Sequence, residues 1–463
     1  MTSDTETATN RTIARAPHIL SREFVWITIG ACALVFLGAF ESLAVTTAMP
    51  AVSADLHGDR LYALAFAGPL ATSVIGMVVA GNWADRRGPV PPLYTSVAVF
   101  VAGLLVAGLA PTMEVLVAGR FAQGLGSGAL TVALYVVVAR VYPSDLHPAM
   151  FAGFAAAWVV PSLIGPTVAG AVTELWSWHW VFLGVVLLVV PALVMVVPAL
   201  RGLGRRSGTT STPWAVGRIG WSVLAALAIL ALDLLGDVPA LGPVLAVAAV
   251  AVALVAVRPL LPRGALRAAR GLPSALLVRG LAAGAFFGAQ VYIPYLLTER
   301  NGLSALLAGL SLTGGALAWS AAAGVQGRLG TRLSSITAVR VGAALVLAGV
   351  ALALAAVLLD AGPVVVVISW VVAGSGMGLL SPRTSALTLA WSTPENQGFN
   401  SAAMTVADAF GSALALAVTG LLFSGAAGLV DPFAAVLVLA TATAVAALVA
   451  SARLTPATPG EPR

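Results

Sequence analysis

The amino-acid sequence predicts an all-α integral membrane protein with two six-helix bundles plus two extra central helices, about 14 transmembrane helices in all. Of its 463 residues, 59% are hydrophobic and only 9% are charged. A soluble domain usually carries about a quarter charged residues, so this chain cannot cover itself with a water-facing surface. Long apolar runs follow one another along the chain, and short basic clusters separate them.

Each predicted helix corresponds to a run of roughly 20 mainly apolar residues, the length that crosses a bilayer. The runs cover 24–50, 61–84, 92–110, 114–139, 148–173, 178–200, 214–235, 240–261, 273–298, 304–326, 336–359, 363–390, 398–424 and 432–452. The first run is too long for a signal-peptide core, so it is predicted to be retained as a span. The organisation that follows is a cytoplasmic tail (1–23), an N-terminal six-helix bundle (24–200), basic linkers with the two extra helices (201–272), a C-terminal six-helix bundle (273–453) and a second tail (454–463). Twelve spans with a surface hairpin at 214–261 is the alternative, because removing two helices preserves the orientation of all others.

The charged residues between the runs predict the orientation of the chain. All 24 basic residues are Arg, and the formal net charge is +6. If the N-terminus is cytoplasmic, most loop arginines fall on the cytoplasmic side, whereas the opposite loops carry mainly Asp and Glu. This bias matches the positive-inside rule and predicts a multi-pass protein of the cell inner (plasma) membrane with both termini cytoplasmic. The arginines form no single patch, so nucleic acid is not expected as a partner.

Several classes of site are not expected. The only cysteine is Cys32, so the chain can form no internal disulfide. Its four histidines do not pair at metal-ligand spacing, so we expect neither a metal nor a cofactor. The short loops hold no cluster of acids and histidines at a membrane edge, so an enzyme is not expected either.

The segment "GNWADRRGP" (81–89) follows the second run and is predicted to be a short cytoplasmic loop. It resembles the signature after helix 2 of the major facilitator superfamily, with Gly81, Asp85, Arg86 and Gly88 at the matching positions. The resemblance implies that Asp85 latches one conformation by contacting the start of a helix in the other bundle, here the helix that begins near 396–400. The match ends after Gly88, where Pro89 and Val90 replace the basic pair of the family pattern.

Three further segments resemble motifs of the same family. "GRFAQGLGSGA" (119–129) is similar to the fourth-helix motif of proton-coupled members, which draws attention to Arg120 and Gln123. "WVVPSLIGPTVAG" (158–170) resembles the fifth-helix antiporter motif, to which we assign Gly153, Pro161, Gly165, Pro166 and Gly170. "FESLAVTTAMP" (40–50) resembles the first-helix motif of fourteen-span drug:proton antiporters, with Glu41 in place of the usual Asp. Together they imply the major facilitator fold and the drug:proton antiporter branch. The motif glycines also suit close helix packing alone, and Pro166 is expected to kink its helix.

Three charged residues inside apolar runs are candidates for proton coupling: Glu41, Arg120 and Asp408. An intramembrane charge is costly and is a functional candidate by default. Arg120 lies about 9 Å below Glu114 and Glu41 about 26 Å above Phe24, so both reach a similar depth near the outer surface. We therefore expect Glu41 and Arg120 to interact. The alternatives to a role in proton coupling are snorkelling of Arg120 toward the membrane surface and a helix–helix hydrogen bond of Asp408.

A substrate cavity is expected beside the helix over 273–298, which Pro294 should break. Its aromatic and amide side chains Phe286, Phe287, Gln290 and Tyr292, together with Gln123, suit a broad lipophilic site. A lipid-facing aromatic belt is the alternative for Tyr292.

The sequence thus predicts a proton-coupled secondary transporter that exports amphipathic or cationic organic compounds by alternating access of its two halves. A cation is expected because two buried acids against one arginine leave the cavity mildly negative. The expected partners are a small-molecule substrate, protons and the lipid bilayer, and the protein is expected to be a monomer. The alternatives are an exporter of a lipid or an endogenous metabolite, an importer, and a non-transporting membrane scaffold.

Overall fold

The computed structural model describes residues 18–58, 61–204, 213–235, 242–303, 305–425 and 431–455. The helices are α1 (Val25–Asp55), α2 (Tyr62–Arg87), α3 (Val90–Gly108), α4 (Met113–Val141), α5 (His147–Ala156), α6 (Val159–Leu175), α7 (His179–Gly204), α8 (Val216–Leu235), α9 (Gly242–Val257), α10 (Leu272–Gln290), α11 (Tyr292–Glu299), α12 (Ala305–Leu329), α13 (Ser335–Leu358), α14 (Pro363–Ala390), α15 (Gln397–Gly425) and α16 (Pro432–Ser451). Short 3-10 turns include η2 (Ser144–Leu146), η3 (Arg258–Leu260), η4 (Ala265–Arg267) and η5 (Gly330–Arg332). Most of the two predicted tails and residues 205–212 of the first linker lie outside the described residues.

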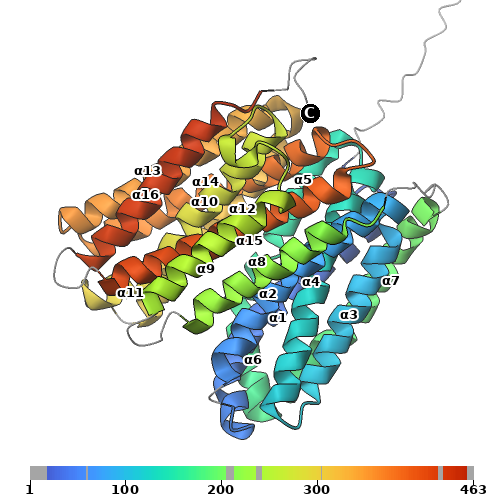
Figure 1. Ribbon diagram of the computed structural model, residues 1–463, viewed down its shortest axis with the longest axis horizontal. Coiled ribbons are helices and arrows are strands. Elements are labelled where there is room, and N and C mark those ends of the chain that lie inside the picture. The colour runs from blue at the N-terminus through green and yellow to red at the C-terminus, as the bar shows by residue number, and fades with distance from the viewer. Residues whose placement is uncertain are drawn as a thin grey trace, which may run out of the picture.

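Buried apolar side chains gather in two large clusters. One lies mainly within α1–α7, where it includes Leu34, Phe100 and Phe182, and it reaches Ala386 and Leu389 of α14. The other lies within α10–α16 and includes Phe286 and Trp370. We call these helix groups the N bundle and the C bundle. Figure 1 shows the two bundles meeting at one end of the molecule and diverging toward the other.

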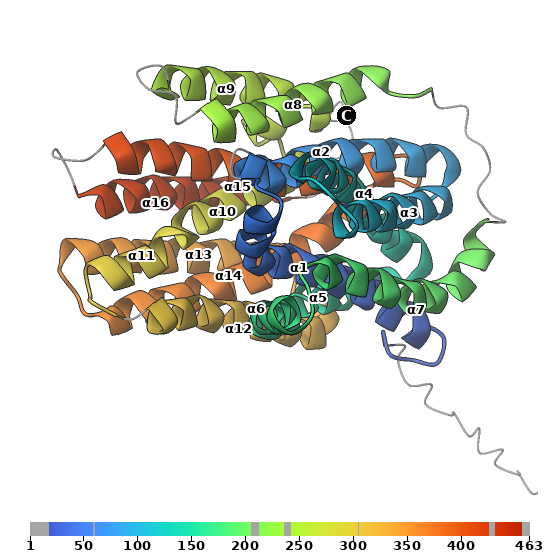
Figure 2. The same cartoon turned by 90° about the horizontal axis from the view of Figure 1, so that it is seen from below.

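The predicted count of fourteen spans is not confirmed. Within the described residues, twelve helical segments are long and apolar enough to cross a membrane. The apolar parts of α8 and α9, Val216–Ala231 and Val244–Leu260, are shorter than the roughly 20 residues that a perpendicular span needs. Figure 2 shows them as a hairpin on the flank of the molecule, beside α2 and α15.

Two predicted spans are each divided into two helices by a proline. The run over 273–298 forms α10 and α11 with a break at Val291, three residues before Pro294, as expected. The run over 148–173 forms α5 and α6 with a break at Ala157 and Trp158. Because a proline ring clashes with the carbonyl four residues before it, Pro161 accounts for this second break. Pro166 does not end its helix, since α6 continues through that residue, and the expected kink there stays a prediction.

The two bundles contact each other at the end that carries Asp85, which we call the Asp85 end. Here α2 packs on α15, and α5 packs on α12 and α14. Arg140 of α4 donates a hydrogen bond across the interface to the backbone oxygen of Pro394, at 2.5 Å. Gln326 of α12 donates one to the backbone oxygen of Pro148, at 3.5 Å. The bundles are therefore joined at the Asp85 end in this conformation.

Candidate functional site

Glu41 and Arg120 form a buried ion pair between α1 and α4 of the N bundle. The Arg120 Nη1 group donates to Glu41 Oε1, and the two side chains are only 8% and 7% exposed. Arg120 also donates from Nη1 to Gln123 Oε1 at 3.0 Å and from Nε to the backbone oxygen of Ala65 at 3.1 Å. The predicted interaction of Glu41 with Arg120 is confirmed. Snorkelling does not describe this arginine, because its charged group is bonded inside the bundle.

The glycines of the predicted antiporter motif face the helix that carries Glu41. A Cβ atom on Gly153 would lie 3.3 Å from Cys32 Sγ, and one on Gly165 would lie 3.6 Å from Leu43 Cβ. A Cβ atom on Gly170 would lie 3.9 Å from Thr47 Cγ2. Small residues at these places let α5 and α6 pack close against α1. This packing is what the structure shows of the motif; its role in antiport stays a prediction.

Asp408 forms a second ion pair, with Arg279 of α10 in the C bundle. Arg279 Nε donates to Asp408 Oδ1 at 2.6 Å, and Nη2 donates to Oδ2 at 3.1 Å. The Asp408 side chain is 30% exposed and that of Arg279 is 10% exposed. Nη1 of Arg279 has no hydrogen-bond partner among the described residues. The pair is therefore bidentate, more open than the first, and has one unused donor.

Arg279 corrects the charge balance expected from the sequence. The expectation of a mildly negative cavity counted two acids against Arg120 alone, and Arg279 supplies a second cation that cancels Asp408. The signal was present, because Arg279 interrupts the apolar run over 273–298 as plainly as Arg120 interrupts its own. Each bundle thus holds an intramembrane arginine, and both are functional candidates by default.

Arg383 is another buried arginine that the motif analysis missed. It is 2% exposed, and it donates from Nε to Gln326 Oε1 at 2.5 Å. Its Nη2 group donates to the backbone oxygens of Gln326 and Gly330 at 2.9 and 2.8 Å. These contacts fix the end of α12, so we assign Arg383 a structural role.

Asp85 joins the two bundles through the start of α15. Its carboxylate accepts hydrogen bonds from the backbone N–H groups of Gly398 at 2.6 Å and Phe399 at 2.8 Å. The first N–H groups of a helix lack partners within the helix and carry partial positive charge, so a carboxylate is a favourable cap. The predicted contact between Asp85 and the helix that begins near 396–400 is confirmed.

The other residues of the Asp85 segment support this close contact. Residues 81–87 form the last two turns of α2 rather than the expected loop, and Gly88 ends the helix with a positive φ of 75° that favours glycine. A Cβ atom on Gly81 would lie 2.5 Å from the Gly398 carbonyl oxygen, so only glycine allows α2 and α15 to approach this closely. The Arg86 guanidinium carbon lies 4.9 Å from the ring centroid of Trp214.

The residues predicted to line a substrate cavity lie in different surroundings. Gln123 is 1% exposed and is bonded to Arg120. Phe286 is 3% exposed and stacks on Trp370 in the C-bundle core, with ring centroids 4.7 Å apart. Phe287 and Gln290 are half-buried. The ring of half-buried Tyr292 lies 4.9 Å from that of Phe423. A substrate role for these residues stays a prediction, and Phe286 is the least accessible of the four on α10 and α11.

The described residues contain no group of three or more His, Cys, Asp or Glu side chains that could hold a metal ion. The polar groups of the candidate site are the Glu41–Arg120 pair, Gln123 beside it, and the Arg279–Asp408 pair. Such groups can exchange a proton or bind a polar part of a ligand.

Comparison with curated proteins finds transporters. The chain is 34% identical over 203 residues to the probable multidrug-efflux transporter Rv1634 of Mycobacterium tuberculosis, and this match covers 42% of each chain. It is 26% identical over 303 residues to the multidrug efflux pump SdrM of Staphylococcus aureus, covering 63% of this chain and 67% of that protein. The match thus spans less than half the length of the Mycobacterium relative.

Comparison with solved structures agrees on the fold. The human organic anion transporter MFSD10 superposes with a TM-score of 0.69 at 13% identity, covering 92% of this chain and 99% of that one. A bacterial homologue of the iron transporter ferroportin, in its outward-facing state, superposes with a TM-score of 0.67 at 13% identity over 91% of this chain and 98% of that one. The family model described as Major Facilitator Superfamily matches residues 31–364. With its helical bundles, this match shows that the chain belongs to the major facilitator superfamily.

Proposed function

We propose that this transporter exports amphipathic organic compounds in exchange for protons. It would lie in the cell inner membrane with its Asp85 end facing the cytoplasm. The multidrug-efflux names of its relatives support export of organic compounds. The buried pair of Glu41 and Arg120 is the observation that carries the proton-coupled part of the proposal.

Glu41 and Arg120 can couple a proton to a change of structure because their charges depend on each other. A proton on Glu41 removes the negative charge that holds Arg120 Nη1, leaving Arg120 with Gln123 and the Ala65 carbonyl as hydrogen-bond partners. A lone buried cation is costly, so protonation favours a rearrangement of α1 against α4. Loss of the proton restores the pair. A substrate that binds better to the deprotonated arrangement would favour release of the proton, and a proton would favour release of the substrate. The two would thereby be exchanged.

Alternating access requires the two bundles to separate at the Asp85 end and to approach each other at the opposite end. Asp85 forms hydrogen bonds with α15, and Arg140 forms one with Pro394, and all of these contacts between the bundles lie at the Asp85 end. We therefore assign the present conformation to the outward-facing state. Opening toward the cytoplasm would break these contacts.

The charge of the substrate is not set by a net charge of the two ion pairs, because each acid is matched by an arginine. In the pair of Arg279 and Asp408, the Asp408 side chain is 30% exposed, and the Arg279 Nη1 group is a buried donor without a hydrogen-bond partner among the described residues. We propose that this pair contacts the polar part of an amphipathic substrate and acts as a second site that protons can reach. Cationic, neutral and anionic compounds should therefore all be tested.

The experiment is gradient-driven transport of ethidium by the purified protein in liposomes, with the wild type compared with Glu41→Gln. We expect an imposed pH gradient to drive transport by the wild type and Glu41→Gln to fall to the level of protein-free liposomes. Glu114→Gln is the matched control, because Glu114 is an exposed acid in the first turn of α4, the helix of Arg120. Its transport should equal that of the wild type.

Three outcomes would contradict parts of the proposal. Gradient-driven transport by Glu41→Gln at the wild-type rate would remove Glu41 from the coupling step. An equal loss in Glu114→Gln would mean that any lost carboxylate disturbs the protein. Failure of the wild type to move ethidium, together with neutral and anionic dyes, would favour the alternative of a narrow exporter for a lipid or an endogenous metabolite.

A further inference from the structure

The α8–α9 hairpin contacts both bundles at once. Its buried apolar residues Ala225, Ala228, Ala253, Ala256, Val257 and Leu260 share one cluster with Val74 and Val78 of α2 and with Val406 and Phe410 of α15. Figure 2 shows the hairpin along the flank where α2 of the N bundle lies beside α15 of the C bundle. A hairpin that only added membrane-spanning length would not need to join these two helices.

The residues just before α8 attach the hairpin to the Asp85 segment. The ring centroids of Trp214 and Trp83 are 6.3 Å apart, and the Arg86 guanidinium carbon lies 4.9 Å from the Trp214 ring centroid. The backbone N–H of Ala215 donates to Asn82 Oδ1 at 3.4 Å. Since α8 also packs along α2, the hairpin is anchored mainly on the N bundle.

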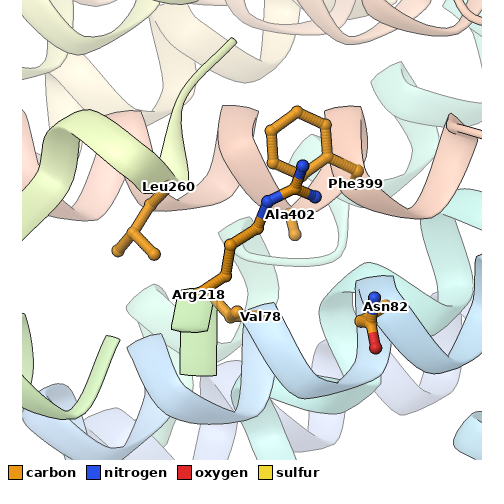
Figure 3. Close-up of a pocket in the computed structure, with 6 residues that line it drawn as sticks. All are labelled: Val78, Asn82, Arg218, Leu260, Phe399 and Ala402. Atoms are coloured by element: carbon orange, nitrogen blue, oxygen red, sulfur yellow. The ribbon is translucent and has the colours of Figure 1, made fainter. Parts of the chain in front are cut away.

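One arginine of the hairpin reaches the C bundle. The Arg218 guanidinium carbon lies 4.0 Å from the ring centroid of Phe399, which is on the first turn of α15. Figure 3 shows the guanidinium group facing this ring. At this distance a guanidinium group and an aromatic ring attract each other. Arg218 and Phe399 also line a small pocket with Asn82 and Leu260.

Phe399 is therefore held twice. Its backbone N–H donates to Asp85 Oδ2 at 2.8 Å, and its ring lies under Arg218. Asp85 belongs to α2 and Arg218 to α8, which moves with α2 if the Trp214 contacts persist. Separation of α2 from α15 would have to break both contacts together.

We propose that the α8–α9 hairpin is a second latch on the Asp85 end, and that Arg218 is a positioning residue that favours the state closed there. In this proposal the hairpin stays packed against α2 and loses its contacts with α15 when the Asp85 end opens. This inference rests on the alternating access of the proposed function, but it requires neither protons nor a particular substrate.

The test measures the conformational equilibrium directly. Spin labels are placed through Leu175→Cys on α6 and Leu359→Cys after α13 in a Cys32→Ser background, since both positions are exposed, by 79% and 78%. They lie in different bundles at the end opposite Asp85, so their separation should shorten when the Asp85 end opens. Pulsed electron–electron double resonance then gives the populations of long and short distances between the labels, with neither a pH gradient nor a substrate present.

We expect Arg218→Ala to raise the ratio of short to long distances about two- to fivefold, the equivalent of the ~0.5–1 kcal/mol of an exposed cation–π contact. Phe399→Leu should give a similar shift, and the double variant should add little to either. Arg218→Lys keeps a cation near the ring and should stay closer to the wild type. Arg263→Ala is the matched control, because it removes an exposed arginine after α9 on the same insert.

Failure of this inference can be told apart from failure of the proposed function. If Arg218→Ala and Phe399→Leu leave the distances unchanged while Asp85→Asn shifts them, the hairpin is not a latch and alternating access stands. If Arg263→Ala shifts them as much as Arg218→Ala, the effect is one of net charge and the inference is wrong. If no variant moves the distances, Asp85→Asn included, the assigned exchange of states at this end fails as well.

Discussion

The acid–arginine pair of the N bundle is sealed from solvent, whereas the acid–arginine pair of the C bundle is partly open. Glu41 and Arg120 are 8% and 7% exposed, but Asp408 is 30% exposed although its geometry with Arg279 is bidentate. The same contrast holds nearer the bundle ends. Tyr142 of the N bundle is 5% exposed, and Tyr295 of the C bundle is 44% exposed.

Under the proposed function, this difference would separate two tasks of the transporter, proton coupling and contact with the substrate. A sealed pair cannot exchange its partner for water, so only a proton or a movement of helices changes its state. A half-open pair can accept a ligand group with little rearrangement, because part of its surface is already accessible. We therefore propose that proton coupling depends chiefly on Glu41 and Arg120, and contact with the substrate chiefly on Arg279 and Asp408.

The largest expected effect is the loss of stability when either buried arginine loses its charge. Arg120→Met leaves the Glu41 carboxylate buried without its partner, which should lower the free energy of unfolding by about 3–5 kcal/mol. Arg279→Met should cost less, about 1–3 kcal/mol, because water can reach part of Asp408. Denaturant unfolding of the purified variants in detergent micelles measures both.

A double variant separates the lost partner from the lost arginine packing. Glu41→Gln combined with Arg120→Met removes the stranded charge and should recover at least half of the loss. Equal losses for Arg120→Met and Arg279→Met would break the comparison, because the two pairs would then be equally dependent on their partners.

The next effect is on transport. Asp408→Asn frees the positive charge of Arg279, so KM for ethidium should rise roughly three- to tenfold, about 0.6–1.4 kcal/mol, and KM for an anionic dye should fall. Dependence on the pH gradient should persist, unlike that of Glu41→Gln. Initial rates in liposomes against substrate concentration give both parameters. A loss of gradient dependence in Asp408→Asn would instead place Asp408 in the coupling step beside Glu41.

Much of this arrangement could be predicted from the sequence. Apolar run lengths located the helices, because a bilayer fixes the length of a span. The contact of Glu41 with Arg120 could be predicted from their similar depths in the membrane, since residues at one depth on neighbouring helices can meet. The motif around Asp85 identified its contact with α15, because a carboxylate suits a helix start.

The remainder depended on packing between distant segments. Which proline breaks a helix could not be decided from sequence, because Pro166 lies within α6 whereas Pro161 ends up four residues after the break. Likewise, the apolar runs at 214–235 and 240–261 did not show that their helices pack against both α2 and α15. Arg279 could be predicted as an intramembrane charge from its apolar run, but it lies outside the segments that resemble family motifs.

The smallest expected effect concerns the two tyrosines. The Tyr142 hydroxyl is 2.7 Å from Thr28 Oγ1, whose own hydroxyl donates to the Ile19 carbonyl oxygen, and its ring lies 5.0 Å from Phe24. Tyr142→Phe loses one buried hydrogen bond and should lower the free energy of unfolding by about 1 kcal/mol. Tyr295→Phe is the matched control in the C bundle and should change it by less than about 0.5 kcal/mol.

The loss at Tyr142 should also depend on pH in a defined window. Burial raises the pKa of Tyr142 from 10.0 to about 12. Between these values the unfolded chain gives up the phenol proton while the folded protein keeps it, so the folded state binds more protons and its stability falls as pH rises. The advantage of the wild type over Tyr142→Phe should therefore be complete below pH 10.0 and shrink above it. Unfolding in detergent from neutral to alkaline pH measures this difference. A difference that stays constant across the window, or one that Tyr295→Phe reproduces, would show that the N bundle does not seal this hydroxyl as the comparison requires.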